Sequence, residues 1–197
     1  TLGIQAQGAK AGARTIDKWL AAGKSMAACN GGYFSPDDFA PTGLQVIRGA
    51  RTGTYLPFGT WGGGFGIRKG SPGIFTEKEV QGQPHVEFDS FIQCSPMLVE
   101  GTVRFTGQGE DIRARRTFVA TDGGSQWVLG TTSGIGLQEL AELLAASAQA
   151  AVGFPVLRAL NLDGGPSSAL WCRGQDGQVF YDKEFWPVKN FIVVNPK

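Results

Sequence analysis

The sequence predicts an α+β fold: one domain, a mixed β-sheet core, two or so packed helices and many Gly-rich turns. Three observations support this class. The 197 residues are enough for one sizeable core. Hydrophobic residues make up 42% and charged residues 18%, a balance typical of globular proteins. The 30 glycines are spread along the chain, which indicates short strands joined by tight turns. We therefore treat residues 1–197 as a single domain.

Two segments favour helices. Residues 15–23 form a short helical stretch, with Thr15 in the capping position and Gly23 at its end. Apolar residues recur at helical spacing further along the chain and predict a second helix over residues 136–150. Both helices are expected to pack their apolar faces on a sheet. The apolar positions of the second helix are Leu137, Leu140, Ala141, Leu144 and Ala148.

Asp-Gly-Gly occurs twice, and the first copy predicts an ordinary hairpin. Asp122, Gly123 and Gly124 separate two strand-like runs, residues 117–121 and 126–129. No chemically reactive side chain flanks this copy. It therefore serves as a control for the second copy.

The second copy follows a strand-like apolar run that ends at Asp163. Gly164, Gly165, Pro166, Ser167 and Ser168 come next, and then the chain is apolar again. A strand holds the carboxylate, while the turn offers backbone N–H groups and hydroxyls beside it. Such an arrangement suits a phosphate or a sugar. A plain hairpin turn is the alternative interpretation.

Two further segments have comparable chemistry. Residues 25–29 form an apolar run that stops at Asn30, and Gly31 and Gly32 follow. Arg115 and Arg116 stand at the head of an apolar strand, where a planar guanidinium can hold a phosphate through two parallel hydrogen bonds. The alternatives are a simple Asn-Gly turn and a pair of solvated arginines.

Together these segments resemble the phosphodiester glycosidase family. The resemblance covers nearly the whole chain, from about residue 25 to the end. Two departures are visible: Pro166 replaces the third glycine of many relatives, and Phe118 stands where a smaller residue is usual. The matching stretches, in the family's order, are residues 30–34, 41–44, 95–99 with Gly101, 116–117, 160–168 and 187–194.

The resemblance implies a hydrolase that cleaves the C1–O bond of a sugar-1-phosphodiester and releases free sugar and a phosphomonoester. Glycosidases usually need two carboxyl groups, one of them to protonate the leaving oxygen. A phosphomonoester is already a weak base, so acid assistance is less necessary here. The reaction then needs a cation for the departing charge and a carboxylate that activates water or attacks C1.

We assign these roles to particular residues. Arg116 would hold the charge, with Arg115 as second candidate, and Asp163 would be the carboxylate. Glu100 is the best second carboxylate, although a solvated turn residue is an equally good interpretation of it. The groups expected to orient the phosphate or the sugar hydroxyls are Asn30, the backbone amides of Gly31, Gly32, Gly164 and Gly165, and the hydroxyl of Ser167 or Ser168.

Two other function classes remain open. One is a non-catalytic domain that binds a sugar phosphate or a cell-wall polymer. The other is a phosphodiesterase that attacks phosphorus, a chemistry that usually recruits metals or a histidine. His85 is the only histidine and reads as a surface residue, and no Cys-x-x-Cys is present. We therefore expect no metal and no cofactor, with a hard cation held by Asp163 and carbonyls as the alternative.

Composition also bears on partners and location. The net charge is +1 without a basic stripe, so nucleic acid is not expected as a partner. No apolar run is long enough to insert into a membrane. Similar bacterial proteins are commonly exported, so we expect an extracytoplasmic (secreted or periplasmic) location, although no signal is present in this chain. Cys29, Cys94 and Cys172 allow at most one internal disulfide, or are three buried thiols. The oligomeric state stays open.

Overall fold

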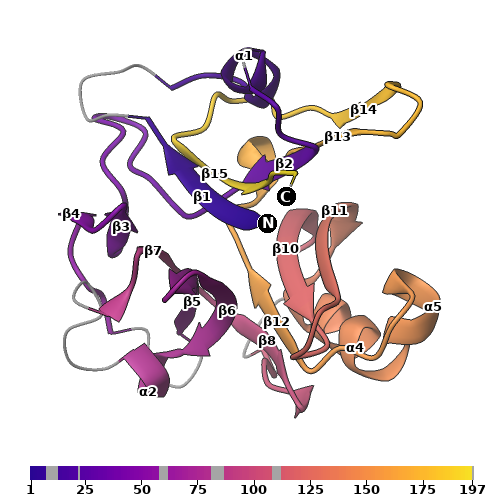
Figure 1. The fold of residues 1–197 in the computed structure, drawn as a ribbon. Helices are drawn as coiled ribbons and strands as arrows, with labels where there is room; N and C mark the ends of the chain where they lie inside the picture. Colours follow the sequence, from indigo (N-terminus) through magenta and orange to yellow (C-terminus); the bar gives the residue numbers. More distant parts are fainter. Residues whose placement is uncertain (8–12, 22, 58–61, 81–86, 108–111, 197) are drawn as a thin grey trace.

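Three antiparallel sheets surround a shared core in the computed structural model (Figure 1). The structure describes residues 1–7, 13–21, 23–57, 62–80, 87–107 and 112–196. The predicted α+β class is confirmed, and the core predicted as one mixed sheet consists of three five-stranded sheets within this part of the chain. The helices lie on the outside of the sheets (Figure 1).

The first sheet joins distant parts of the sequence. Its register pairs Ile192 with both Ile4 and Cys29, so β15 lies between β1 and β2. As a result Asn30, which ends β2, lies opposite Phe191 near the start of β15. The strand order is β1 (Leu2–Ala6), β15 (Asn190–Val194), β2 (Ala27–Asn30), β13 (Leu170–Arg173) and β14 (Val179–Asp182).

The second sheet is built from the segment between residues 45 and 94. Gly64 and Gly66 of its β5 strand lie against Phe91, and an added Cβ at Gly64 would be only 2.2 Å from that ring. Glycine is therefore required where the strand and the ring meet. The strand order is β4 (Ala50–Thr52), β3 (Gln45–Ile47), β7 (Ser90–Cys94), β5 (Gly63–Arg68) and β6 (Ser71–Thr76).

The third sheet carries the longest strands. Its register pairs Phe118 with Asn161 and Arg158 with Glu100, so the start of β10 and the end of β12 lie at the same end of the sheet. Glu100 lies at the opposite end of the strands. The strand order is β11 (Trp127–Ile135), β10 (Ala114–Thr121), β12 (Arg158–Asn161), β8 (Met97–Glu100) and β9 (Thr102–Val103).

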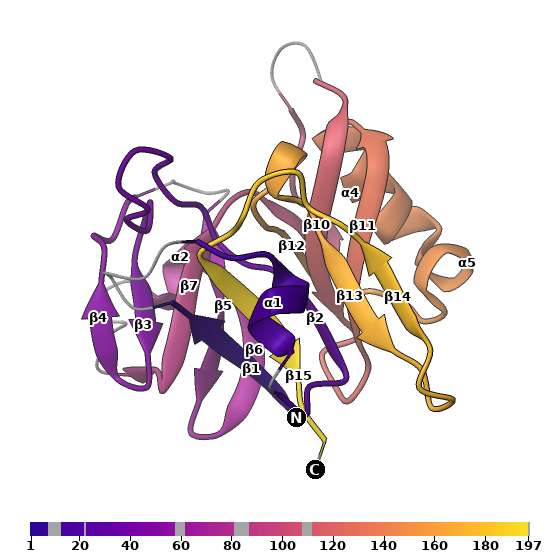
Figure 2. The ribbon, with the colours of Figure 1, turned by 90° about the horizontal axis from the view of Figure 1, so that it is seen from above.

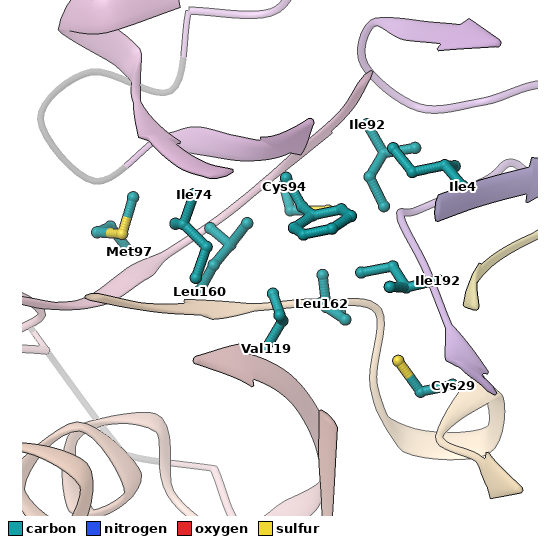
Figure 3. Packing of buried hydrophobic residues seen from close by; sticks show 11 residues of the cluster. Ile4, Cys29, Ile74, Ile92, Cys94, Met97, Val119, Leu160, Leu162 and Ile192 are labelled. Carbon is teal, nitrogen blue, oxygen red and sulfur yellow. The ribbon is translucent and has the colours of Figure 1, made fainter. Parts of the chain in front are cut away.

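One hydrophobic cluster fills the space where the three sheets meet (Figure 3). Apolar side chains from every sheet contribute, which fixes the sheets against one another by burial of a common surface. The first sheet provides Ile4, Cys29 and Ile192, the second Phe65, Ile74, Ile92 and Cys94, and the third Met97, Val119 and Leu160, with Leu162 just beyond it. Cys29 and Cys94 are buried here as small apolar groups, and all three cysteines are free thiols.

The helices follow the sequence pattern with two differences. α1 (Ile16–Leu20) begins directly after Thr15, as predicted, and packs on the first sheet, but it ends at Leu20 with Ala21 as its C-cap, before the predicted end at Gly23. The stretch predicted as one helix over residues 136–150 consists of α4 (Leu137–Ala146) and α5 (Ala148–Val152), which separate at Ser147. The helix is interrupted at Ser147, where the backbone has φ −123° and ψ 20°, outside helical geometry. Serine has a lower helix propensity than the alanines beside it. Figure 2 shows α4 and α5 along the outside of the third sheet.

The two Asp-Gly-Gly segments fold differently. Asp122, Gly123 and Gly124 join β10 to β11, which confirms the predicted hairpin. Asp163 is followed by a short 3-10 turn, η2 (Gly165–Ser167), and the chain then crosses from the third sheet into β13 of the first sheet. This segment therefore connects two sheets and is not a hairpin. None of the helices that the structure describes has the length and apolar character needed to cross a membrane.

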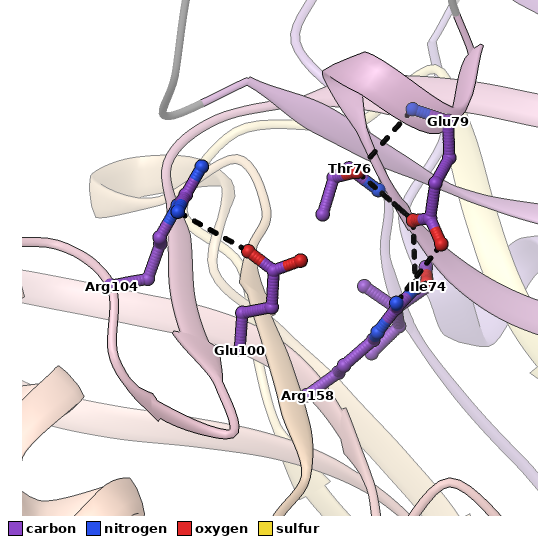
Figure 4. A network of polar contacts seen from close by, with 6 residues as sticks. All are labelled: Ile74, Thr76, Glu79, Glu100, Arg104 and Arg158. Atoms are coloured by element: carbon purple, nitrogen blue, oxygen red, sulfur yellow. Dashed lines mark hydrogen bonds and ion pairs between the residues drawn. The ribbon is translucent and has the colours of Figure 1, made fainter.

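Arg158 joins the third sheet to the second sheet, at the end of the strands where Glu100 lies (Figure 4). Its guanidinium donates to the Ile74 carbonyl at 2.7 Å and to the two carboxylate oxygens of Glu79 at 2.8 and 3.0 Å. Glu79 belongs to the short helix α2 (Glu77–Val80) and also accepts from Thr76. Burial acts to raise the pKa of Glu79, but the hydrogen bonds from Arg158 and Thr76 outweigh it and lower the pKa below its ordinary value.

We expect Glu79→Gln to lower the free energy of unfolding by about 1 kcal/mol at neutral pH, because a two-point ion pair that is partly exposed is lost. The lowered pKa means that this contribution is present above the ordinary value of 4.5 and disappears as pH falls through the folded-state value below it. Urea unfolding of the wild type and the variant, at neutral pH and in acid, measures the stability difference and its disappearance at low pH. Glu87→Gln, which removes a more exposed 3.5 Å pair with Arg68, is the matched control and should cost less. A difference that persists unchanged in acid would contradict the assignment.

Candidate active site

The site forms where strands of the first and third sheets end at the same place. The end of β2 contributes Asn30, the start of β10 contributes Arg116, and the segment after β12 contributes Asp163. We call residues 163–169 the site turn. Three segments separated by many residues in the sequence are thus brought together at one edge of the molecule.

The Asn30 side chain binds the site turn at both ends. Its Nδ2 donates to the Asp163 carbonyl at 2.7 Å, and its Oδ1 accepts from the Ala169 N–H at 3.0 Å. The same Oδ1 accepts from the Thr117 hydroxyl of β10 at 2.7 Å. Asn30 is buried, and its amide is occupied by protein partners on both the oxygen and the nitrogen. The structure therefore shows it in contact with the turn and with β10.

Gly31 and Gly32 are needed for close packing. The Gly32 N–H donates to the Asn190 Oδ1 at 2.6 Å, and the Gly31 carbonyl accepts from the Asp163 N–H at 3.0 Å. A Cβ on Gly31 would lie 2.1 Å from the Asn190 Oδ1, so any side chain there would displace the Asn190 amide. The two glycines of the Asn-Gly-Gly sequence thus let β2, β15 and the site turn approach one another. They serve close packing and not the simple Asn-Gly turn that the composition suggests.

Asp163 is half-buried. Burial raises the pKa of its carboxyl group, while hydrogen bonds from the Ser167 hydroxyl and the Gly164 N–H act in the opposite direction. The Gly164 bond is 2.8 Å long. A carboxylate with a raised pKa accepts a proton more readily than an exposed aspartate, which is the property that a general base needs.

Tyr33, Asn161 and Ser95 form a second polar group beside Asp163. The Tyr33 hydroxyl donates to the Ser95 carbonyl and accepts from the Asn161 Nδ2 at 2.9 Å. Burial, followed by the proximity of Cys94 and Asp163, raises the pKa of Tyr33, so the phenol stays protonated. The Asn161 Oδ1 is buried and has no hydrogen-bond partner among the described residues. It is an acceptor at the site that the protein itself leaves unused.

The two neighbouring arginines have different surroundings. Arg115 forms an ion pair with Asp182, with Nη2 and Oδ1 at 2.7 Å, and also donates to the Lys183 carbonyl. Arg116 donates from Nε to the Ile135 carbonyl at 3.2 Å and from Nη2 to the Ile112 carbonyl. Within the described ranges, no carboxylate lies within ion-pair distance of Arg116. The charge of Arg115 is therefore compensated by Asp182, whereas Arg116 has no carboxylate partner among the described residues.

The site turn brings Arg116 close to Asp163. An ideal Cβ on Gly164 would lie 3.0 Å from the Arg115 carbonyl and 3.8 Å from the Arg116 Cδ, so the turn packs directly on this strand. Gly165 adopts a φ of 58°, which favours glycine. Ser167 is turned toward the Asp163 carboxyl group. The Ser168 hydroxyl is fully buried, and its oxygen has no hydrogen-bond partner in the described part of the chain.

Glu100, the second carboxylate of the sequence analysis, lies elsewhere. The structure does not bring Glu100 to this cluster. Glu100 lies at the opposite end of the third sheet's strands, where its Oε2 is 3.4 Å from the Arg104 Nη1. Five residues of extended chain from Arg158, which pairs with Glu100, to Asp163 span roughly 15 Å. His85 lies outside the described residues. Across the described ranges, no three His, Cys, Asp or Glu side chains are grouped so that they could hold a metal ion.

Sequence reasoning did not single out Tyr33, Asn161, Thr117 or Asn190 as site residues. The signal that would have found three of them is a polar side chain inside or at the end of an apolar strand run. Asn161 lies two positions before Asp163, Thr117 follows Arg116, and Asn190 precedes residues 191–194, which are all apolar. Such residues are buried with the strand and must find hydrogen-bond partners there.

Comparisons with known proteins identify the family of the chain. A family profile described as phosphodiester glycosidase matches residues 23–195, so the chain belongs to the phosphodiester glycosidase family. The search of curated proteins finds no significant match.

Two solved structures share the fold. The catalytic domain of zebrafish N-acetylglucosamine-1-phosphodiester alpha-N-acetylglucosaminidase, auto-inhibited by its pro-peptide, superposes with a TM-score of 0.71 at 18% identity. That match covers 100% of this chain and 73% of the zebrafish chain. A hypothetical protein from Synechocystis superposes with a TM-score of 0.62 at 15% identity, covering 98% of this chain and 56% of its own. At these identities the likeness establishes the fold.

Gly31→Ala should destabilise the protein by about 3 kcal/mol, because the methyl group displaces the Asn190 amide and leaves a buried hydrogen bond unmade. Urea unfolding measures this. Gly134→Ala is the matched control, since a Cβ there meets nothing within 4 Å. If the two variants unfold at the same urea concentration, the close approach of Gly31 to Asn190 is not important for stability.

Proposed function

We propose that this protein hydrolyses the C1–O bond of a sugar-1-phosphodiester and releases a free sugar and a phosphomonoester. The observation that carries the proposal is that the turn after the half-buried Asp163 packs at Gly164 on Arg116, a cation with no carboxylate partner among the described residues. Family membership supports hydrolysis of a phosphodiester-linked sugar in general terms, and the roles of individual residues below are part of the proposal.

Arg116 is proposed to bind the phosphodiester. Two of its N–H groups donate to backbone carbonyls, which hold the guanidinium in place without neutralising its charge. The remaining donors match a pair of phosphate oxygens. As the C1–O bond breaks, the electron pair leaves with the phosphomonoester, and a fixed cation next to that group stabilises the developing charge.

Asp163 is proposed to act on the other side of the bond. Either it takes a proton from the water that attacks C1, or it attacks C1 itself and forms a glycosyl intermediate that water then hydrolyses. In the first case the sugar emerges with inverted configuration and in the second with retained configuration. The raised pKa of Asp163 suits the first role without excluding the second.

The remaining polar residues are proposed to position these two. Asn30 keeps the site turn against β10 and so sets the separation of Asp163 from Arg116. Tyr33 and Asn161 hold each other beside the carboxylate. The unused Asn161 Oδ1 is buried and provides an acceptor for an internal water. Buried polar networks of this kind fix a geometry because each bond lost leaves an unpaired group.

The substrate is proposed only as a class. The zebrafish neighbour is named for an N-acetylglucosamine-1-phosphodiester, which makes that sugar the first to test here. A screen of sugar-1-phosphodiesters in water labelled with heavy oxygen, with product identification, separates three outcomes. Free sugar with an unlabelled phosphomonoester supports the proposal, and binding without product indicates a non-catalytic domain. A labelled phosphomonoester or sugar phosphate indicates attack on phosphorus.

Arg116→Lys should lower kcat by about 10²-fold, because an ammonium group cannot reproduce the two-point contact of the guanidinium. Folding should be unaffected, as monitored by thermal unfolding. Arg113→Lys is the matched control, since Arg113 is exposed and paired with Glu139. Wild-type turnover in Arg116→Lys would remove Arg116 from the mechanism and make Arg115 the next candidate.

Asp163→Asn should lower the rate by at least ~10²-fold while ligand binding persists, because the amide keeps the shape of the carboxylate and loses its basicity. In the wild type, kcat/KM should decline as pH falls through a pKa above the ordinary 3.8 of aspartate. A raised folded-state pKa stabilises the fold below that ordinary value, and this contribution is lost as pH rises through the raised value. At neutral pH the variant should therefore unfold at an equal or higher temperature. Full activity in the variant would refute the role.

A further inference from the structure

Two large aromatic side chains are exposed next to the site turn. Phe185 is 75% exposed and Trp186 is 54% exposed, both in the segment between β14 and β15. Their backbone N–H groups both donate to the Pro166 carbonyl, at 2.8 and 3.1 Å. Pro166 belongs to η2 inside the site turn, three residues after Asp163. The aromatic pair is therefore attached to the same turn as the proposed catalytic carboxylate.

Glu184, the residue before this aromatic pair, holds the segment in place through two hydrogen bonds. Glu184 is buried, and its Oε1 accepts from the Ile16 N–H at 2.6 Å while its Oε2 accepts from the Tyr181 hydroxyl at 2.5 Å. These bonds tie the segment to the start of α1 and to β14. A buried carboxylate that binds two partners holds its backbone in place. Phe185 and Trp186 are thus displayed on a fixed support.

Arg115 connects the pair to the strand that carries Arg116. Its ion pair with Asp182 and its bond to the Lys183 carbonyl hold the guanidinium against the segment. The Arg115 Cζ lies 4.9 Å from the centre of the Phe185 ring. A cation on an aromatic face orients that ring. Arg115, whose charge Asp182 compensates, therefore orients the Phe185 ring.

We infer that Phe185 and Trp186 form a platform for a pyranose ring of the substrate, which rests on the function proposed above. A sugar ring has apolar C–H faces and polar edges, and an exposed aromatic ring suits such a surface. The support is ordered before binding, so little conformational entropy is lost when a ring stacks on it. The area is that of two side chains, which fits a single sugar better than a protein partner.

Calorimetry with uncleavable probes tests the platform on the wild-type protein. In a first set of phosphonates, a CH2 group replaces the glycosidic oxygen, and the phosphorus also carries a methyl ester. In a second set, methylphosphonate is esterified to the 6-hydroxyl of a pyranose, so the sugar lies on the other side of phosphorus. Glucose, N-acetylglucosamine and mannose are used in both, and methyl methylphosphonate supplies the charge without a sugar.

At least one sugar probe should bind about tenfold more tightly than methyl methylphosphonate, which is what stacking on two aromatic rings supplies. The double variant Phe185→Ala with Trp186→Ala should lose this difference and keep its affinity for methyl methylphosphonate. Trp186→Phe should retain most of it. Phe180→Ala removes another exposed aromatic, on β14, and should change neither affinity. Whichever probe set shows the effect identifies the sugar as the glycosyl group or the leaving group.

The inference and the proposed function fail separately. If the wild type turns over a phosphodiester and the double variant binds and hydrolyses it equally well, the platform is wrong and the function stands. If no substrate is hydrolysed but the sugar-dependent affinity is lost in the double variant, the platform stands without the hydrolysis. Equal binding of sugar probes and methyl methylphosphonate by the wild type overturns the platform. So does a double variant that changes only self-association in sedimentation.

Discussion

The buried amide of Asn30 is the interaction on which the rest of the site depends. One side chain accepts from β10, accepts from the end of the site turn and donates to its beginning. Only a carboxamide can do all three, because it offers an acceptor with two lone pairs and a donor on the same planar group. Aspartate could not donate, and an apolar residue would leave three polar groups unpaired in a dry place, at about 1–3 kcal/mol each. The position of Asp163 relative to Arg116 follows from these bonds.

Asparagines play the same part elsewhere around the site. Asn190 binds the backbone of Gly32, and Asn161 binds Tyr33 and the Ser95 carbonyl. Each joins segments that belong to different sheets or to the loops between them. The apolar cluster at the centre holds the three sheets together without specifying direction, whereas these amides specify which backbone atoms meet. The catalytic proposal therefore rests on a framework in which packing supplies stability and amides supply alignment.

The sequence predicts the fold class, the hairpin at Asp122 and the start of α1, because each depends on local composition and periodicity. The division into three sheets was not predictable, since it depends on pairings such as Ile4 with Ile192 that no local pattern reveals. Asn30, Arg116 and Asp163 were singled out together, and the structure places them at one edge. Reading residues separately could not show that the Asn30 amide is occupied by the protein, that Asp182 compensates Arg115, or that Glu100 lies at the opposite end of the strands, because each depends on a distant neighbour.

The place of β15 in the first sheet has a consequence for how the protein is made. It follows every other described strand in the chain, yet it lies between β1 and β2 and carries Asn190 into the site. During synthesis β1 and β2 emerge early and must wait, with unpaired edges, for residues 190–194 to arrive. The first sheet cannot close on the ribosome until residues 190–194 have been translated. Folding of the site is thus a late event, and any nascent chain released before that strand would carry Asp163 and Arg116 without the sheet that aligns them.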